Sequence, residues 1–147
     1  MNLSFRKYNF NIHKQDDKLF IFDEVRKKNV IITPEEWVRQ NLLHYFYEDL
    51  AYPRSKIAIE KEFILNGRKK RFDMLVFDRD MNPFLLLECK SQAESLNENV
   101  LRQCLNYNMN FKVPYLCISN GDFTFLWSLK NGKAEVLETF PLYPKKD

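Results

Sequence analysis

The segment Phe84–Lys90, which reads Phe-Leu-Leu-Leu-Glu-Cys-Lys, constrains the fold of this chain more than any other. Four consecutive large apolar residues lead directly into Glu88 and Lys90, which are separated by one residue. An uninterrupted apolar run is typical of a central strand that is covered on both faces. The segment therefore predicts a sheet with packing layers on both sides and two charged groups at the end of a buried strand.

The residues at its N-terminus predict where the first helix begins. Thr33 precedes Pro34, and Glu36 follows in the first turn, which is a capping box with the favoured proline at the first helical position. Apolar residues at helical spacing continue to about residue 50. The remaining predicted elements are a strand at 57–65, an Asn66-Gly67 turn, strands at 70–77 and 84–90, a helix at 96–111, a strand at 114–119 and a hairpin of 122–129 and 134–137.

These elements predict an α/β fold with a mixed β-sheet flanked by helices. Their order is α-β-β-β-α-β, with a further C-terminal β-hairpin. The strand at 114–119 should run parallel to the strand at 84–90, through a right-handed crossover. A chain of 147 residues suits one domain. We expect residues 1–32 to form an N-terminal arm with short strands near 19–22 and 30–32, residues 33–140 the main body, and residues 141–147 a tail.

Composition narrows the function classes. The net charge of +3 permits nucleic-acid binding without requiring it. Cys89, Cys104 and Cys117 lie in apolar stretches without metal-ligand spacing, which indicates buried, reduced thiols. No P-loop motif occurs, so an ATP-driven motor is not expected. No apolar run approaches the roughly 20 residues that span a bilayer, and the N-terminus has no signal-peptide pattern, so we expect a cytoplasmic protein with no membrane contact.

Three charged residues are predicted to meet at the end of one hairpin. If the strands at 70–77 and 84–90 pair about a turn near Met81, Asp73 lies opposite the neighbourhood of Cys89. Glu88 and Lys90 share one face, and a suitable register brings Asp73 to it. Two adjacent carboxylates repel unless a divalent cation lies between them, and oxygen ligands suit Mg²⁺ or Mn²⁺. With a lysine beside them, these groups suit phosphodiester hydrolysis.

Each of these residues could instead have a purely structural role. Spacing of the form Asp-x14-Glu-x-Lys occurs by chance, and Glu88 could simply end an edge strand in solvent. Gln103 and Tyr107 lie four residues apart on one helix face, where they could reach the site or be partly exposed. A capping-box residue such as Glu36 needs no catalytic role.

Several of these segments occur in the same order in a known family. The run Thr33–Gln40 resembles the first helix of the N-terminal domain of type I restriction enzyme R subunits. The other segments that resemble this domain are Arg71-Phe72-Asp73, Leu87-Glu88-Cys89-Lys90, Gln103-x3-Tyr107-Asn108 and Ser119-Asn120-Gly121. These domains are PD-(D/E)XK nucleases, so the resemblance implies a restriction-endonuclease-like fold. Phe72 stands where the superfamily's motif has its proline, a common departure.

The resemblance also implies a Mg²⁺-dependent DNA endonuclease, with Mn²⁺ as an alternative metal. Asp73 and Glu88 would bind the metal together with the backbone carbonyl of Cys89, and Lys90 would be the catalytic lysine. The full set of residues implied at the catalytic site is Asp73, Glu88, Lys90, Glu36, Gln103 and Tyr107. Within it, the Gln-x3-Tyr pair would support the site or contact DNA, and the helix acid would lie near the metal.

Basic residues are expected to contact DNA phosphates and to give salt-dependent affinity. The predicted DNA-binding set is Arg39, Arg54, Lys56, Arg68, Lys69, Lys70 and Arg71. The alternative for each cluster is a solvated surface or hairpin tip. No helix-turn-helix or zinc-finger spacing occurs, so sequence-specific readout by this chain is not expected.

Two classes of function are favoured by the sequence. The first is a metal-dependent DNA endonuclease that works without a helicase motor, with a homodimer as a plausible way to cut both strands. The second is a nucleic-acid-binding or interaction module that retains the fold without cleaving and works with a separate motor or specificity protein. A third interpretation, a purely structural domain, predicts that Glu88 and Lys90 point into solvent, away from Asp73.

Overall fold

The computed structural model describes Leu3, residues 5–65 and residues 67–145. Asn66, in the predicted turn, lies outside the described residues. Its elements are β1 (Ile12–Gln15), β2 (Lys18–Asp23), β3 (Lys28–Ile31), α1 (Pro34–His44), β4 (Ile57–Ile59), β5 (Glu62–Leu65), β6 (Arg68–Arg71), β7 (Met74–Phe77), β8 (Pro83–Cys89), α2 (Glu98–Met109), β9 (Tyr115–Ser119), β10 (Thr124–Lys130) and β11 (Lys133–Leu137), with a π-helical turn at Tyr45–Asp49 and a 3-10 turn at Arg54–Lys56.

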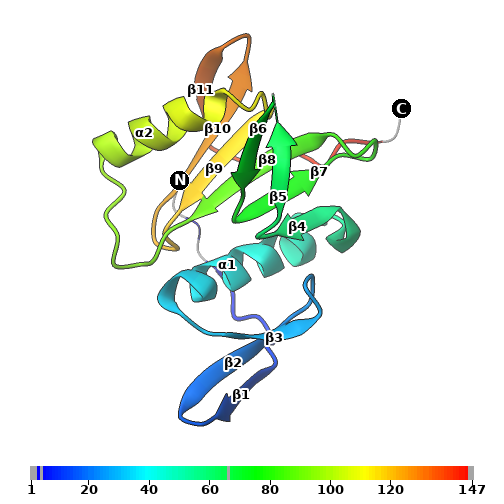
Figure 1. Ribbon diagram of the computed structural model, residues 1–147, viewed down its shortest axis with the longest axis vertical. Helices are drawn as coiled ribbons and strands as arrows, with labels where there is room; N and C mark the ends of the chain where they lie inside the picture. Colours follow the sequence, from blue (N-terminus) through cyan, green and yellow to red (C-terminus); the bar gives the residue numbers. More distant parts are fainter. Residues whose placement is uncertain (1–2, 4, 66, 146–147) are drawn as a thin grey trace.

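A six-stranded mixed sheet with the order β11-β10-β9-β8-β7-β4 forms the centre of the molecule (Figure 1). Its strand β8 pairs antiparallel with β7 and parallel with β9. The parallel pair confirms the predicted direction of the strand that follows the second helix. The mixed α/β architecture also confirms the predicted fold class, and it is consistent with a restriction-endonuclease-like fold.

The apolar run of β8 is buried on both faces, as its sequence predicted. Leu85 and Leu87 are fully buried in a core that they share with Leu42 of α1. The intervening Leu86 faces a second core, which includes Leu116 of β9 and the apolar side of α2. The two helices therefore cover opposite faces of the sheet. Glu88 lies near the C-terminal end of β8.

Helix α1 begins at the predicted cap. The Thr33 side chain accepts a hydrogen bond from the backbone N–H of Glu36 at 3.0 Å, and Pro34 occupies the first turn. The helix then widens into the π-helical turn, in which the Leu50 N–H donates to the Tyr45 carbonyl at 3.0 Å. None of the helices in the described part of the chain is long and apolar enough to cross a membrane.

The N-terminal arm forms a separate three-stranded sheet, β1-β2-β3, on the side of α1 away from the main sheet (Figure 1). Ile21 and Asp23 of β2 are completely buried there. Because α1 is covered on two sides, several of its polar residues lie in the interior. The buried polar residues of α1 are Glu36, Arg39, Gln40, Asn41 and His44.

The structure differs from the predicted strands by two breaks and one additional strand. The strand predicted at 57–65 breaks at Glu60, which has a left-handed φ of 50°, and the strand predicted at 70–77 breaks before Met74. Between these breaks, β5 and β6 pair only with each other and leave the main sheet. The additional strand β1 was not predicted, because its four residues are all exposed and lack apolar alternation.

Candidate active site

Asp73 and Glu88 are the residues next to the last pair of the β7–β8 ladder, in which Met74 pairs with Leu87. Their side chains have different partners: Glu88 contacts Asn108 of α2, and Asp73 lies near Arg39 of α1. Oδ2 of Asp73 accepts a hydrogen bond from the backbone N–H of Cys89 at 2.8 Å, which anchors this carboxylate to the end of β8.

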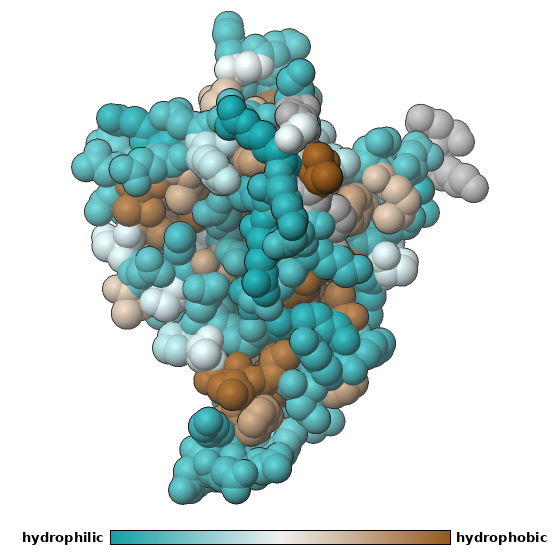
Figure 2. All heavy atoms as spheres, viewed as in Figure 1, coloured by the Kyte–Doolittle hydropathy of each residue, from teal (hydrophilic) through white to brown (hydrophobic). Residues whose placement is uncertain are grey.

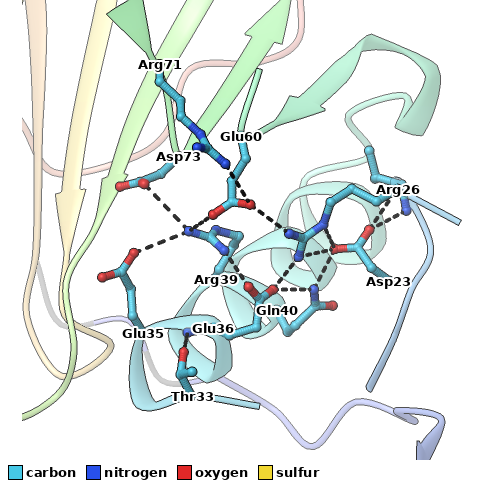
Figure 3. A network of polar contacts seen from close by, with 11 residues as sticks. Asp23, Arg26, Thr33, Glu35, Glu36, Arg39, Gln40, Glu60, Arg71 and Asp73 are labelled. Carbon is cyan, nitrogen blue, oxygen red and sulfur yellow. Dashed lines mark hydrogen bonds and ion pairs between the residues drawn. The ribbon is translucent and has the colours of Figure 1, made fainter. Parts of the chain in front are cut away.

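The Asp73 carboxylate lies among charged groups from several elements. Nη2 of Arg39 is 3.6 Å from its Oδ1 (Figure 3). Burial raises the pKa of Asp73, and the charge of Glu88 raises it further, while the Cys89 N–H, Arg39 and Lys90 oppose the shift without cancelling it. A partly buried carboxylate beside a second carboxylate is a group that an added cation stabilises.

Glu35 is the acid of α1 that faces Asp73. Its Oε1 lies 3.3 Å from Nη2 of Arg39, the same nitrogen that approaches Asp73 (Figure 3). Burial raises the pKa of Glu35, and the charge of Asp73 raises it further, whereas Arg39 and Lys90 lower it. Glu35, Asp73 and Lys90 therefore influence one another electrostatically at this end of the sheet.

Glu36 instead belongs to a buried network of ion pairs (Figure 3). Its carboxylate accepts hydrogen bonds from Arg26, Arg39 and, at 2.9 Å, from Nε2 of Gln40. Asp23 completes the network, because it accepts from Arg26 at 2.9 Å and from Gln40 at 2.7 Å. The N-terminal arm and α1 therefore hold the Glu36 carboxylate between them, and its role near a metal stays a prediction.

Arg39, which was predicted to contact DNA, lies in the same buried network. Only 3% of this residue is exposed. Its guanidinium is held by Glu36 inside the network, and burial, which alone would lower the pKa of Arg39, is outweighed by the charges around it, led by Glu36. An arginine enclosed in this way neutralises carboxylates of the protein rather than phosphates of a ligand.

Glu88 is held by α2 and by β6. Nδ2 of Asn108 donates to its Oε1 at 2.8 Å, and Nζ of Lys70 lies 3.4 Å from the same oxygen. The Cys104 thiol donates to Oε2 at 3.5 Å. Burial, followed by the charge of Glu88, raises the pKa of this thiol to about 11, so it remains protonated at neutral pH.

Lys70 is the second predicted DNA-binding residue that is buried in the structure. It is 8% exposed, whereas its neighbours Lys69 and Arg71 on β6 are exposed. Side chains alternate along a strand, so Lys70 points to the side of Phe72 and α2. Its ammonium bonds to Asn108 and lies beside Glu88.

The other predicted site residues lie at the surface. Gln103 and Tyr107 are exposed on α2, and the residues of that helix that contact Glu88 are the next ones along, Cys104 and Asn108. The predicted DNA-binding residues that are exposed are Arg54, Arg68, Lys69 and Arg71, and Lys56 is half-buried with its ammonium near the carbonyl of Arg79.

A comparison with protein-family models decides the family of this chain. The model described as "Type I restriction enzyme R protein N terminus (HSDR_N)" matches residues 34–141, which is most of the chain. The chain belongs to this family. No curated protein sequence matches it.

The part of the chain matched by the restriction enzyme R N-terminal family coincides with the main structural unit. It begins at the first residue of α1 and includes both helices and all six strands of the central sheet. Asp73, Glu88 and Lys90 all lie within it, and the arm with Asp23 and Arg26 lies outside. The arm therefore adds to this family domain the side chains that complete the network around Glu36.

Sequence reasoning missed Glu35, Lys70, Cys104 and Asn108 as neighbours of the proposed ligands. Two signals could have found some of them. The two-residue period of β6 puts Lys70 on the side of the apolar Phe72, away from Lys69 and Arg71. Cys104 lies four residues before Asn108, so one helix face presents both to whatever packs beside it. Glu35 had no such signal, because the capping box drew attention to Glu36.

Proposed function

We propose that this chain is a metal-dependent DNA endonuclease with a role in restriction and modification. The observation that carries the proposal is that the hydrogen bond from the Cys89 N–H holds the Asp73 carboxylate at the end of β8, next to Glu88 in the chain and with Lys90 following. Membership in the restriction enzyme R N-terminal family supports the same function. The site combines two carboxylates and an ammonium group, which suit metal-assisted phosphodiester hydrolysis.

The residues fit a divalent cation of the Mg²⁺ or Mn²⁺ type. Asp73 and Glu88 are oxygen donors whose mutual repulsion contributes to the raised pKa of Asp73, and a cation held between them would relieve it. Their carboxylates, with the backbone carbonyl of Cys89, would hold the metal. When bound, it would polarise the attacked phosphate and lower the pKa of a bound water.

The remaining groups have distinct roles in this proposal. Lys90 neutralises charge at the attacked phosphate and orients the nucleophile. Glu35, which interacts with both Asp73 and Lys90, is proposed as the acid of α1 that supports the site. Arg39, 3.6 Å from Asp73, holds that carboxylate in position from within the protein.

The hairpin of β5 and β6 is the proposed DNA-binding surface. Its exposed basic residues are Arg68, Lys69 and Arg71. Figure 2 shows a hydrophilic ridge along one side of this hairpin, and Ile64 of β5 is an exposed apolar residue. The hairpin leads directly into Asp73 along the chain, so phosphates bound along it would pass close to the proposed metal ligands.

The test is metal-dependent cleavage of plasmid DNA by the wild-type chain, Asp73→Ala and Lys90→Ala, with Mg²⁺ and Mn²⁺ tested separately. Lys130→Ala, an exposed lysine on β10, is the matched control. We expect cleavage by wild type and control, and none by the two site variants. Equal activity in all four proteins would refute the proposal. Duplex, single-stranded and branched DNA and RNA, tested in parallel, would define the substrate.

A second candidate function is a DNA-binding module that does not cleave and acts with a partner protein. The observation that favours it is that buried cations of the protein, Arg39 and Lys70, already lie against the carboxylates of Asp73 and Glu88. This alternative predicts DNA binding without cleavage under every metal condition. Light scattering of the chain alone, and co-purification with motor or specificity proteins, would test for a homodimer and for a larger assembly.

A further inference from the structure

Lys70 is a buried ammonium group directed at one of the proposed metal ligands. Its Nζ lies 3.4 Å from Oε1 of Glu88 and also donates to Oδ1 of Asn108. It is enclosed by aromatic rings whose centroids lie 4.3 to 5.1 Å from Nζ. These rings belong to Phe72, Tyr107 and Phe111.

The surroundings of Lys70 provide three kinds of partner for an ammonium group. Burial lowers the pKa of Lys70, and the charge of Glu88 and its hydrogen bond oppose that shift without cancelling it. A buried ammonium is costly unless it has a carboxylate, hydrogen-bond acceptors or ring faces as partners, and Lys70 has all three. Asn108 links the two charged groups, because its Oδ1 accepts from Lys70 while its Nδ2 donates to Glu88.

We infer that Lys70 is the internal counter-ion of Glu88 and that a divalent cation must compete with it for this carboxylate. Lys70 thereby limits the metal affinity of the site. The inference rests on the proposed function, because it requires the metal site of Asp73 and Glu88. Lys70 acts as a positioning residue: it directs the Glu88 carboxylate toward α2, and its positive charge repels a metal bound to the same oxygens.

The experiment measures Mn²⁺ binding to the full chain by the electron paramagnetic resonance signal of free Mn²⁺. Lys70→Met removes the charge and keeps an apolar stem for the rings to pack against. We expect it to bind Mn²⁺ more tightly than wild type, on the order of tenfold or more, because a unit charge close to the metal is removed. Lys130→Met, at an exposed position of β10, is the control and should bind as wild type does.

A second readout separates this role from a purely structural one. Removing Lys70 leaves Glu88 without its counter-ion, so metal-free Lys70→Met should unfold at a lower temperature than wild type. Added Mn²⁺ should raise its Tm by more than it raises that of wild type. Lys70→Gln, which keeps a hydrogen-bond donor for Asn108, serves if the methionine variant does not fold, and it should show the same gain in Mn²⁺ affinity.

The outcomes distinguish the inference from the proposed function. Mn²⁺ binding by wild type, with equal or weaker binding by folded Lys70 variants, would overturn the inference and leave the metal site standing. Mn²⁺ binding by the Lys70 variants but not by wild type would support the inference. If neither wild type nor any folded variant bound Mn²⁺, the metal site itself would be refuted, and the inference with it.

Discussion

Replacing Arg39 with methionine tests whether the buried ion-pair network holds the site together. The guanidinium is enclosed, with 3% of the residue exposed, and bonds to the buried carboxylate of Glu36. Its Nη2 also lies within 3.6 Å of Glu35, Glu60 and Asp73. Methionine keeps the apolar stem of the side chain but leaves the Glu36 carboxylate with Arg26 and the amide of Gln40 as its remaining side-chain partners among the described residues.

The magnitude follows from this burial. Removing one partner of a buried ion pair typically costs about 3–5 kcal/mol, because the other charge stays buried. For a chain of this size, each kcal/mol lowers the Tm by roughly 2–4 °C, so we expect a fall of about 6–20 °C. The same substitution at Arg102, whose pair with Glu98 is exposed, should cost less than about 1 kcal/mol.

Urea unfolding followed by circular dichroism measures these free energies. A double-mutant cycle with Glu36→Gln isolates the pair, and we expect a coupling energy of about 1–3 kcal/mol. A loss below about 1 kcal/mol in Arg39→Met, or a coupling near zero, would refute the reasoning that the network stabilises the fold. The variant also tests the predicted DNA contact by Arg39: if its burial keeps it from phosphates, the salt dependence of DNA binding should not change.

Three further predictions concern the surface, the helix acid and the arm. Replacing Arg68, Lys69 and Arg71 together with methionine should weaken duplex binding and reduce the slope of log K against log salt by about 0.9 for each phosphate that the protein no longer neutralises, which anisotropy titrations would measure; an unchanged slope would place the DNA elsewhere. Glu35→Gln should slow cleavage and leave the free energy of unfolding within about 0.5 kcal/mol of wild type, so a large loss of stability with full activity would contradict its proposed role. Burial alone would raise the pKa of Asp23, but the N–H groups and charge of Arg26 and the amide of Gln40 hold it below its usual range. The stabilisation by the Asp23 carboxylate is therefore present above its unfolded pKa and disappears as the pH falls through its folded pKa. The difference in unfolding free energy between wild type and Asp23→Asn should shrink as the pH falls below about 4.

Local sequence signals determined much of the fold. The capping box at Thr33 placed the start of α1, and the apolar run at Phe84–Leu87 identified the central strand with its covered faces. Such features are encoded within a few residues, because capping, alternation and turn chemistry act over one or two turns of chain. The same signals predicted the antiparallel hairpin that brings Asp73 to the end of β8.

The sequence did not predict which strands pair with each other. The apolar alternation around Glu60 predicted a single strand, but the chain changes partner there, so that β4 joins the main sheet and β5 pairs with β6 alone. A strand pattern reports that a residue is extended and half-buried, and it carries no information on which strand pairs with it.

The sequence by itself determined which charged residues this protein has near its proposed site, and in what order. Only the tertiary structure decided which of them face solvent. Lys69 and Lys70 are neighbours of the same type, yet one is exposed and the other lies enclosed between Glu88 and the rings beside α2. Glu35 and Glu36 divide in the same way, one toward Asp73 and the other into the network with the arm. The environment of a charge is set by elements distant in sequence that pack against it, and no pattern within a few residues specifies that packing.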